Sequence, residues 1–280
     1  MKFSDMSSSK NNSNLMMIVV IVGAIFIGII VFAISSLLFS KPEKNNSNTE
    51  KLETKVELEL DSKKVKNLYK YVTYGEDNIF VKTPNIKLEN FSDYDKYYYS
   101  GSLIKEDDVK EIEDRDSGNK LHTIDYSKIK TNMEKYFGEG VDFEKESVVT
   151  IMLPFDIDGK NICTLTYNEN LTAYTVSCNE KKEINNNSYR ELISAKEENN
   201  KIILKEKLFF INQKEENDKI NYDIYKDYNH TILITSDDID KKDFNLENIY
   251  KDNKKQLTTI TYTFKKNKKD YYFYSSKFSD

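Results

Sequence analysis

The sequence predicts an α+β protein, with one N-terminal transmembrane helix followed by a soluble domain that has a mainly antiparallel β-sheet and a few short helices. Three observations predict it: a long uncharged apolar segment near the N-terminus, a series of short strand-like segments separated by polar turns, and two amphipathic helical patterns. Short connections favour antiparallel strands, because a parallel pair needs a crossover of about a dozen residues or more.

The apolar segment covers residues 15–39 and contains no charged residue. As a helix rising about 1.5 Å per residue, it is longer than a hydrocarbon core of about 30 Å. A cleaved signal peptide is the alternative, since residues 33–35 resemble a cleavage site, but the apolar run continues through Phe39. We interpret the segment as a membrane anchor.

The flanks of this anchor define the predicted organisation. Residues 1–14 form a short tail, and residues 40–55 are polar enough to be a disordered tether. Two lysines precede the segment and four follow it, so the positive-inside rule, counted simply, favours the reversed topology. That rule is weak for a long translocated domain, and the C-terminal flank is also rich in glutamate. We expect a single-pass protein of the cell membrane with a cytoplasmic N-terminus and an extracytoplasmic domain over residues 56–280. This domain is either undivided or split into a helix-containing part, 56–140, and a β-rich part, 141–280. The alternative is the reversed topology, in which the domain is cytoplasmic.

Composition limits the classes of partner. The net charge is -5 with both signs interspersed, so no basic face suited to nucleic acid stands out. Abundant lysine, with two arginines and no tryptophan, is typical of an AT-rich bacterial genome. Ala24 and Gly28 have the spacing that allows two membrane helices to pack, which would give a homodimer. Otherwise the expected partner is an unidentified protein or cell-envelope component.

The domain begins with a short strand from Val56 and a helix capped by Asp61 or Ser62. A second helix follows Asp125, and Gly138 is placed to end it. The remaining apolar patterns are strand-like, and a sheet is needed to bury the apolar faces of both helices. The predicted strands are 147–154, 161–167, 173–179, 188–196, 201–211, 219–225, 230–235, 256–265 and 270–277.

Two of these strands form a hairpin whose register the sequence predicts. Cys163, Leu165 and Tyr167 share one face, as do Tyr174, Val176 and Cys178 on the next strand, so a single register pairs all six residues and places the two cysteines opposite each other. A disulfide between Cys163 and Cys178 is therefore plausible and would favour an extracytoplasmic location. Two reduced, buried cysteines are the alternative.

Other motifs predict structure rather than chemistry. Residues 156–161 lack the spacing of a calcium loop and fit a hairpin turn. The acidic runs 106–108 and 237–240 are interleaved with lysines and are expected in solvated loops. Tyrosines 97–99 are interpreted as bulky strand residues. No motif predicts a metal site or a cofactor.

The order His122, Cys178, Arg190 downstream of a membrane anchor is superficially similar to sortase-type transpeptidases. That resemblance implies a nucleophilic Cys178, with His122 assisting proton transfer and Arg190 stabilising the oxyanion. A disulfide at Cys178 would remove the thiolate that this chemistry needs. The favoured interpretation is a non-enzymatic, membrane-anchored binding or interaction domain, with the sortase-like transpeptidase or hydrolase as the alternative function.

Overall fold

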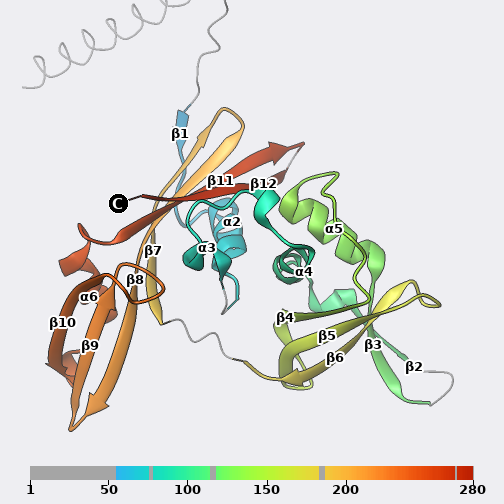
Figure 1. Cartoon of the computed structure of the whole chain (residues 1–280). Coiled ribbons are helices and arrows are strands. Elements are labelled where there is room, and N and C mark those ends of the chain that lie inside the picture. Colours follow the sequence, from blue (N-terminus) through green and yellow to red (C-terminus); the bar gives the residue numbers. More distant parts are fainter. Residues whose placement is uncertain (1–54, 76–77, 114–117, 183–186, 269, 280) are drawn as a thin grey trace, which may run out of the picture. The chain divides into compact units, whose positions relative to one another are not determined.

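The computed structural model describes residues 55–75, 78–113, 118–182, 187–268 and 270–279 (Figure 1). The chain divides into two units, Met1–Leu52 and Glu53–Asp280. The predicted tail, the predicted transmembrane helix at 15–39 with Ala24 and Gly28, and all but the last residue of the predicted tether lie outside the described residues. Within the described ranges, no helix has the length and apolarity needed to cross a membrane.

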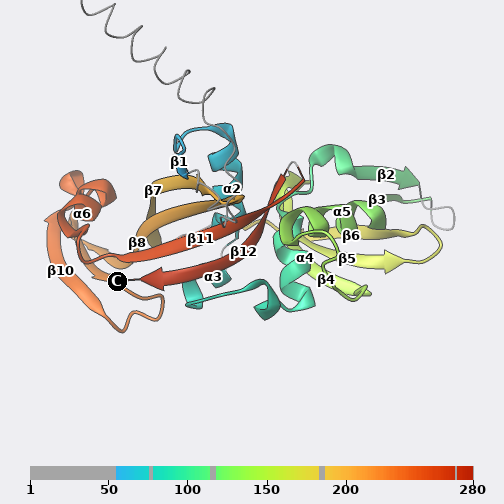
Figure 2. The ribbon, with the colours of Figure 1, turned by 90° about the horizontal axis from the view of Figure 1, so that it is seen from above.

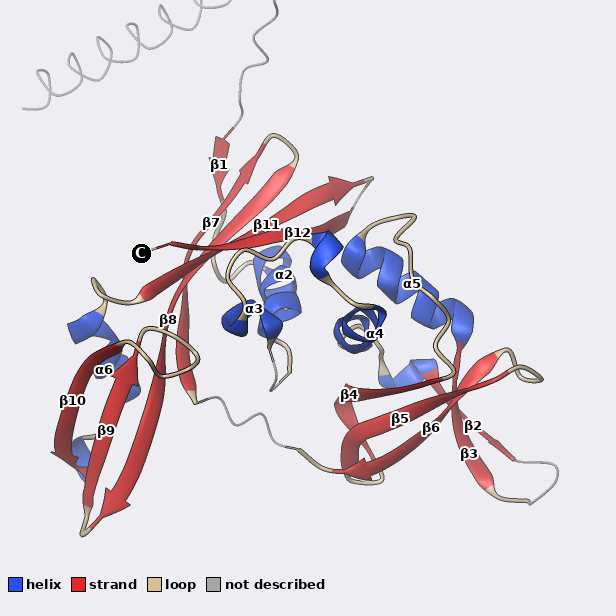
Figure 3. Ribbon diagram, in the orientation of Figure 1, coloured by secondary structure: helices blue, strands red, loops and turns tan. Residues whose placement is uncertain are grey.

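The largest element of the second unit is a seven-stranded sheet in which every strand pairing is antiparallel (Figures 1 and 3). The strands follow the order β1-β7-β8-β11-β12, and β9 pairs with β8 and β10. The two C-terminal strands form a long hairpin (Figure 2). The strands are β1 (Lys55–Glu57), β7 (Ser188–Glu198), β8 (Lys201–Glu216), β9 (Lys219–Tyr225), β10 (Leu233–Asp240), β11 (Thr258–Asn267) and β12 (Asp270–Ser279).

The β8 strand is long enough to pair with three neighbours. One edge pairs with β7, while the other edge pairs with β11 over residues 201–208 and then with β9 over residues 210–216. From Lys201 to Leu208, buried residues of β8 alternate with more exposed ones. This is expected for a strand that has one face on the core and the other toward solvent.

A second sheet has five antiparallel strands in the order β2-β3-β6-β5-β4. The predicted antiparallel pairing and the small helical content are thus confirmed, but the expectation of a single sheet is wrong, because the strands separate into two sheets. The strands are β2 (Val109–Glu113), β3 (Lys120–Asp125), β4 (Val148–Ile157), β5 (Lys160–Asn168) and β6 (Ala173–Glu180).

Five α-helices are described (Figure 3). The first predicted helix is confirmed, with Ser62 as its N-cap accepting a hydrogen bond from the Val65 amide. The second ends at Gly138 as predicted, where φ is +102° and a side chain would be strained. The α-helices are α2 (Lys63–Thr73), α3 (Ile79–Lys82), α4 (Asp93–Gly101), α5 (Tyr126–Phe137) and α6 (Leu246–Asn253), and the 3-10 helices are η1 (Leu88–Asn90), η2 (Glu106–Asp108) and η3 (Lys241–Asp243).

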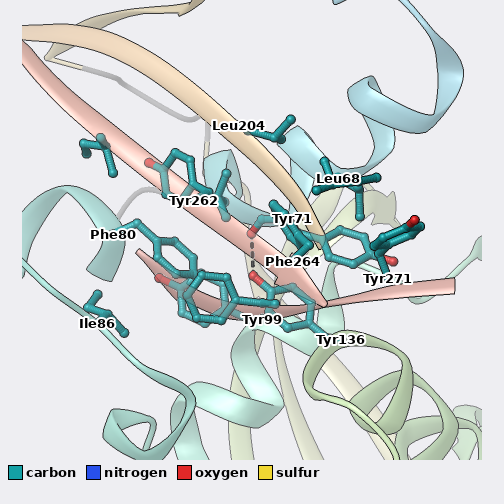
Figure 4. Close-up of a cluster of buried hydrophobic side chains, with 14 of the residues drawn as sticks. Leu68, Tyr71, Phe80, Ile86, Tyr99, Tyr136, Leu204, Tyr262, Phe264 and Tyr271 are labelled. Carbon is teal, nitrogen blue, oxygen red and sulfur yellow. Dashed lines mark hydrogen bonds between the residues drawn. The ribbon is translucent and has the colours of Figure 1, made fainter. Parts of the chain in front are cut away.

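An aromatic core joins the helices to the seven-stranded sheet (Figure 4). Tyr71 of α2 stacks on Tyr136 of α5 at 4.8 Å between ring centroids, and the Tyr136 hydroxyl donates a hydrogen bond to the Tyr71 carbonyl oxygen at 2.5 Å. Because α5 also packs against the five-stranded sheet through Ile129 and Met133, this helix belongs to two hydrophobic cores. A third core lies between α6 and the β8–β9 region.

Several predicted elements are corrected by the structure. Tyr97 and Tyr99 are buried residues of α4, not strand residues, because Ser92 and Asp95 form a capping box that begins a helix there. The acidic run at 237–240 belongs to β10 instead of a loop, and β10 begins at Leu233 instead of residue 230. The run at 106–108 forms η2. The predicted turn between β4 and β5 is confirmed, with positive φ at Asp158 and Gly159.

Candidate functional site

The two cysteines lie on β5 and β6. The predicted register is confirmed, since Cys163 is opposite Cys178 and the Leu165–Val176 and Tyr167–Tyr174 pairs follow in step. The structure joins the two sulfur atoms in a disulfide, and no free cysteine is present. A nucleophilic thiol is therefore lacking at Cys178 in this structure.

The structure places the other two residues of the sortase-like arrangement in different sheets. His122 lies on β3, with its Nε2 3.7 Å from an oxygen of Asp158. Arg190 lies on β7 and forms a salt bridge of 2.7 Å with Glu206, which has no exposed surface. Its guanidinium also donates to the Tyr262 hydroxyl and to a carbonyl oxygen of α2. Arg190 is thus occupied within the core, and no interaction with Cys178 is seen among the described residues.

A groove of about 760 Å³ opens on the surface of the second unit. Its walls come from the C-terminal half of α2, the turn that follows α4, the end of α5, the second half of β4, the start of β5 and the segment that follows β6. These elements can be followed in Figure 1. The volume lies within the range of about 300 to 1,000 Å³ that is typical of small-molecule sites. The groove is therefore the candidate binding site.

The floor of the groove is apolar. Met152, Leu153 and Ile104 are buried, and the half-buried side chains of Leu103 and Phe155 complete the surface. A floor of this kind favours the apolar part of a ligand, because binding removes apolar surface from water on both sides.

The rim of the groove is basic. The lining contains five lysines and one carboxylate, that of Asp156, which together give a formal charge of +4. The whole chain, by contrast, carries a formal net charge of -5. Asp156 forms a salt bridge of 2.8 Å with Lys181. The five lysines are Lys70, Lys105, Lys135, Lys181 and Lys182.

Three of these lysines form no salt bridge with any residue that the structure describes. They are Lys70 in the last turn of α2, Lys105 at the start of η2 and Lys135 in the last turn of α5. All three are exposed residues. The rim therefore holds positive charge that the described part of the protein leaves available to a ligand.

Two polar side chains fix the walls of the groove. The Asn161 side chain accepts a hydrogen bond from the Lys182 amide at 2.9 Å and donates one to the Lys182 carbonyl oxygen at 3.0 Å, which holds this lysine against β5. Across the groove, the Tyr74 hydroxyl donates to the Met152 carbonyl oxygen. Burial raises the pKa of Tyr74, so the phenol stays protonated and remains a donor at neutral pH.

No local sequence motif marks the residues that line this groove. The five lysines are spread over more than 100 residues in a chain with 42 lysines and arginines, so neither spacing nor enrichment distinguishes them. The described residues also contain no group of three His, Cys, Asp or Glu side chains that could hold a metal ion.

Comparisons with known proteins assign no family. No protein-family model, curated protein or solved structure matches the chain. The functional argument therefore depends on the groove itself, on the charge of its rim and on the apolar residues of its floor.

Proposed function

We propose that this chain is a membrane-anchored, extracytoplasmic binding protein and that the groove between α2, α4 and β4 is its binding site. The groove carries the proposal, because it combines a volume suited to a small molecule with an apolar floor and a charged rim. The apolar segment at 15–39 supports a position beside a membrane.

The described lining of the groove offers no histidine, no cysteine and no unpaired carboxylate to act as a general base. A catalytic site needs a nucleophile or a general base within hydrogen-bond reach of the reacting atom. The titratable side chains that line the groove are lysines, two tyrosines and an aspartate already paired with Lys181. Tyr71 and Tyr74 are poor bases at neutral pH, because burial raises the pKa of Tyr71 to about 12 and that of Tyr74 further still.

A single tryptophan introduced in the groove would test the proposal. The chain has no tryptophan, so Phe155→Trp would report on this site alone. The full chain, held in nonionic maltoside micelles, is titrated with hexyl phosphate, hexanol and hexyltrimethylammonium. We expect at least one of the three to change the fluorescence of Trp at this position in a saturable way.

The matched control is Tyr274→Trp, which places the reporter on an exposed residue of β12 that does not line the groove. Its fluorescence should not respond. If none of the three compounds changes the signal at position 155, or if both reporters respond equally, the groove is not a binding site and the proposal fails.

A further inference from the structure

The distribution of charge around the groove indicates which class of ligand it binds. Lysines near helix C-termini commonly stabilise the partial negative charge of the last carbonyl groups. This role accounts for the positions of Lys70 and Lys135 in the last turns of α2 and α5, but it leaves both ammonium groups without a salt-bridge partner among the described residues. It does not explain Lys181 and Lys182, which follow a β-strand, nor Lys105, which precedes a 3-10 helix.

The side-chain contacts strengthen this distinction. Asn161 is a buried residue, and its side-chain amide forms two hydrogen bonds with the backbone of Lys182. These bonds fix the backbone of this rim lysine to β5. The carboxylate of Asp156 is already paired with Lys181. The charge of this lysine offsets part of the repulsion between Asp156 and an anionic ligand.

The apolar floor adds a second requirement. A small inorganic anion would contact the lysine ammonium groups but leave Leu103 and Phe155 in water. A ligand with an acidic head and a short apolar body would satisfy both the rim and the floor, and the methylene stems of the lysines would extend the apolar surface.

We infer that the groove binds an anionic amphiphile, a single small molecule with a phosphate or carboxylate head at the lysine rim and an apolar body over Leu103 and Phe155. This inference rests on the proposed function and specifies its ligand class. The charge of the rim disfavours a cationic head group at the same position, because three lysine ammonium groups without a salt-bridge partner among the described residues would repel it.

The test compares head groups on one apolar body. In the full chain carrying Phe155→Trp, hexyl phosphate should bind at least tenfold more tightly than hexanol or hexyltrimethylammonium, and inorganic phosphate should bind at least tenfold more weakly than hexyl phosphate. Raising the salt concentration should weaken hexyl phosphate binding, because the rim lysines are exposed. Calorimetric titration of the unsubstituted chain provides an independent measurement.

Lysine variants locate the charge effect. Replacing Lys70 and Lys135 together with glutamine should weaken hexyl phosphate binding by about fivefold, since each exposed ion pair contributes modestly. Lys63→Gln with Lys130→Gln is the matched control, because these exposed lysines lie on the same two helices outside the groove lining. The control should change binding less than twofold, and thermal unfolding should show that both double variants are folded.

The outcomes separate the inference from the proposed function. If hexanol binds in the groove as tightly as hexyl phosphate, the site binds ligands but is not selective for anions, and the inference fails alone. If inorganic phosphate binds as tightly, the apolar body is irrelevant and the inference also fails. If none of the hexyl compounds binds, both the inference and the proposed function are overturned.

Discussion

At the scale of single residues, the carboxylate of Glu206 links α2 to the seven-stranded sheet. It accepts hydrogen bonds from the Tyr69 hydroxyl at 2.6 Å, the Tyr262 hydroxyl at 2.5 Å and the Arg190 guanidinium at 2.7 Å. Burying two charges is costly, but these contacts satisfy both partners. Removing one partner would leave the other charge unpaired in the core.

We therefore expect Glu206→Gln to lower the free energy of unfolding by about 3 to 5 kcal/mol. Urea unfolding of the variant measures this loss. Glu191→Gln, a substitution at a partly exposed residue of β7, serves as the control and should cost less than about 0.5 kcal/mol. Equal stability of the two variants would show that the Arg190–Glu206 pair does not stabilise the fold.

Glu197 of β7 provides a pH-dependent contribution. Hydrogen bonds from Lys64 and Tyr271 lower the pKa of its carboxyl below the ordinary value of 4.5. A carboxyl with a lower pKa in the folded than in the unfolded state adds stability above the unfolded pKa, and this is lost as the pH falls through the folded value. The contribution is therefore present at neutral pH and absent in strong acid.

Glu197→Gln should consequently be less stable than the native chain at pH 7, by about 1 kcal/mol or less, and nearly equal to it at about pH 2.5. Thermal unfolding at both pH values measures the difference. Glu180→Gln, at an exposed residue of β6, is the control substitution. A stability difference that persists in acid would contradict the assignment.

At the scale of elements, the β5–β6 hairpin shows what the sequence can predict. Its register follows from the alternation of apolar residues, since a shift by one residue would turn every core side chain to the opposite face. The neighbouring β4–β5 turn at Asp158 follows from the Asp-Gly step. Such local rules need no knowledge of the rest of the fold.

Helix α4 shows where this reasoning fails. Its three consecutive tyrosines favour a strand by propensity, but Tyr97 packs in the core of the five-stranded sheet and Tyr99 in the core of the seven-stranded sheet. Tertiary packing on two sides overrides the local preference. Likewise the apolar pattern places the start of β10 too early, because pairing with β9 and not apolar content defines the limits of this strand.

The disulfide within the β5–β6 hairpin should stabilise the fold. Its cysteines are separated by 15 residues, which corresponds to about 3 kcal/mol in the chain-entropy account. Cys163→Ala with Cys178→Ala should therefore lower the free energy of unfolding by about that amount, as measured in urea without reductant. Mass spectrometry after alkylation of the non-reduced native chain should find both cysteines unmodified; one rapidly alkylated thiol at Cys178 would instead favour the sortase-like alternative.

At the scale of the whole molecule, the groove could not be predicted from the sequence, because its residues come from six separate segments that only the folded chain brings together. The proposed anchor is the opposite case, since residues 15–39 are one continuous pattern. The proposal of a membrane-bound protein rests on this pattern alone.

The anchor predicts that the full chain stays with the membrane fraction after an alkaline carbonate wash and that deleting residues 15–39 releases it. Protease added to whole cells should digest residues 56–280, as expected for an extracytoplasmic domain. Protection of these residues would support the reversed topology. A freely soluble chain that begins near residue 36 would show that the segment is a cleaved signal peptide.

The most direct test of the proposed site is a crystal structure of the protein with hexyl phosphate. We predict the phosphate among Lys70, Lys105 and Lys135, with the hexyl chain over Leu103 and Phe155. A groove left empty at saturating concentration, or a hexyl phosphate bound only elsewhere on the surface, would contradict the account.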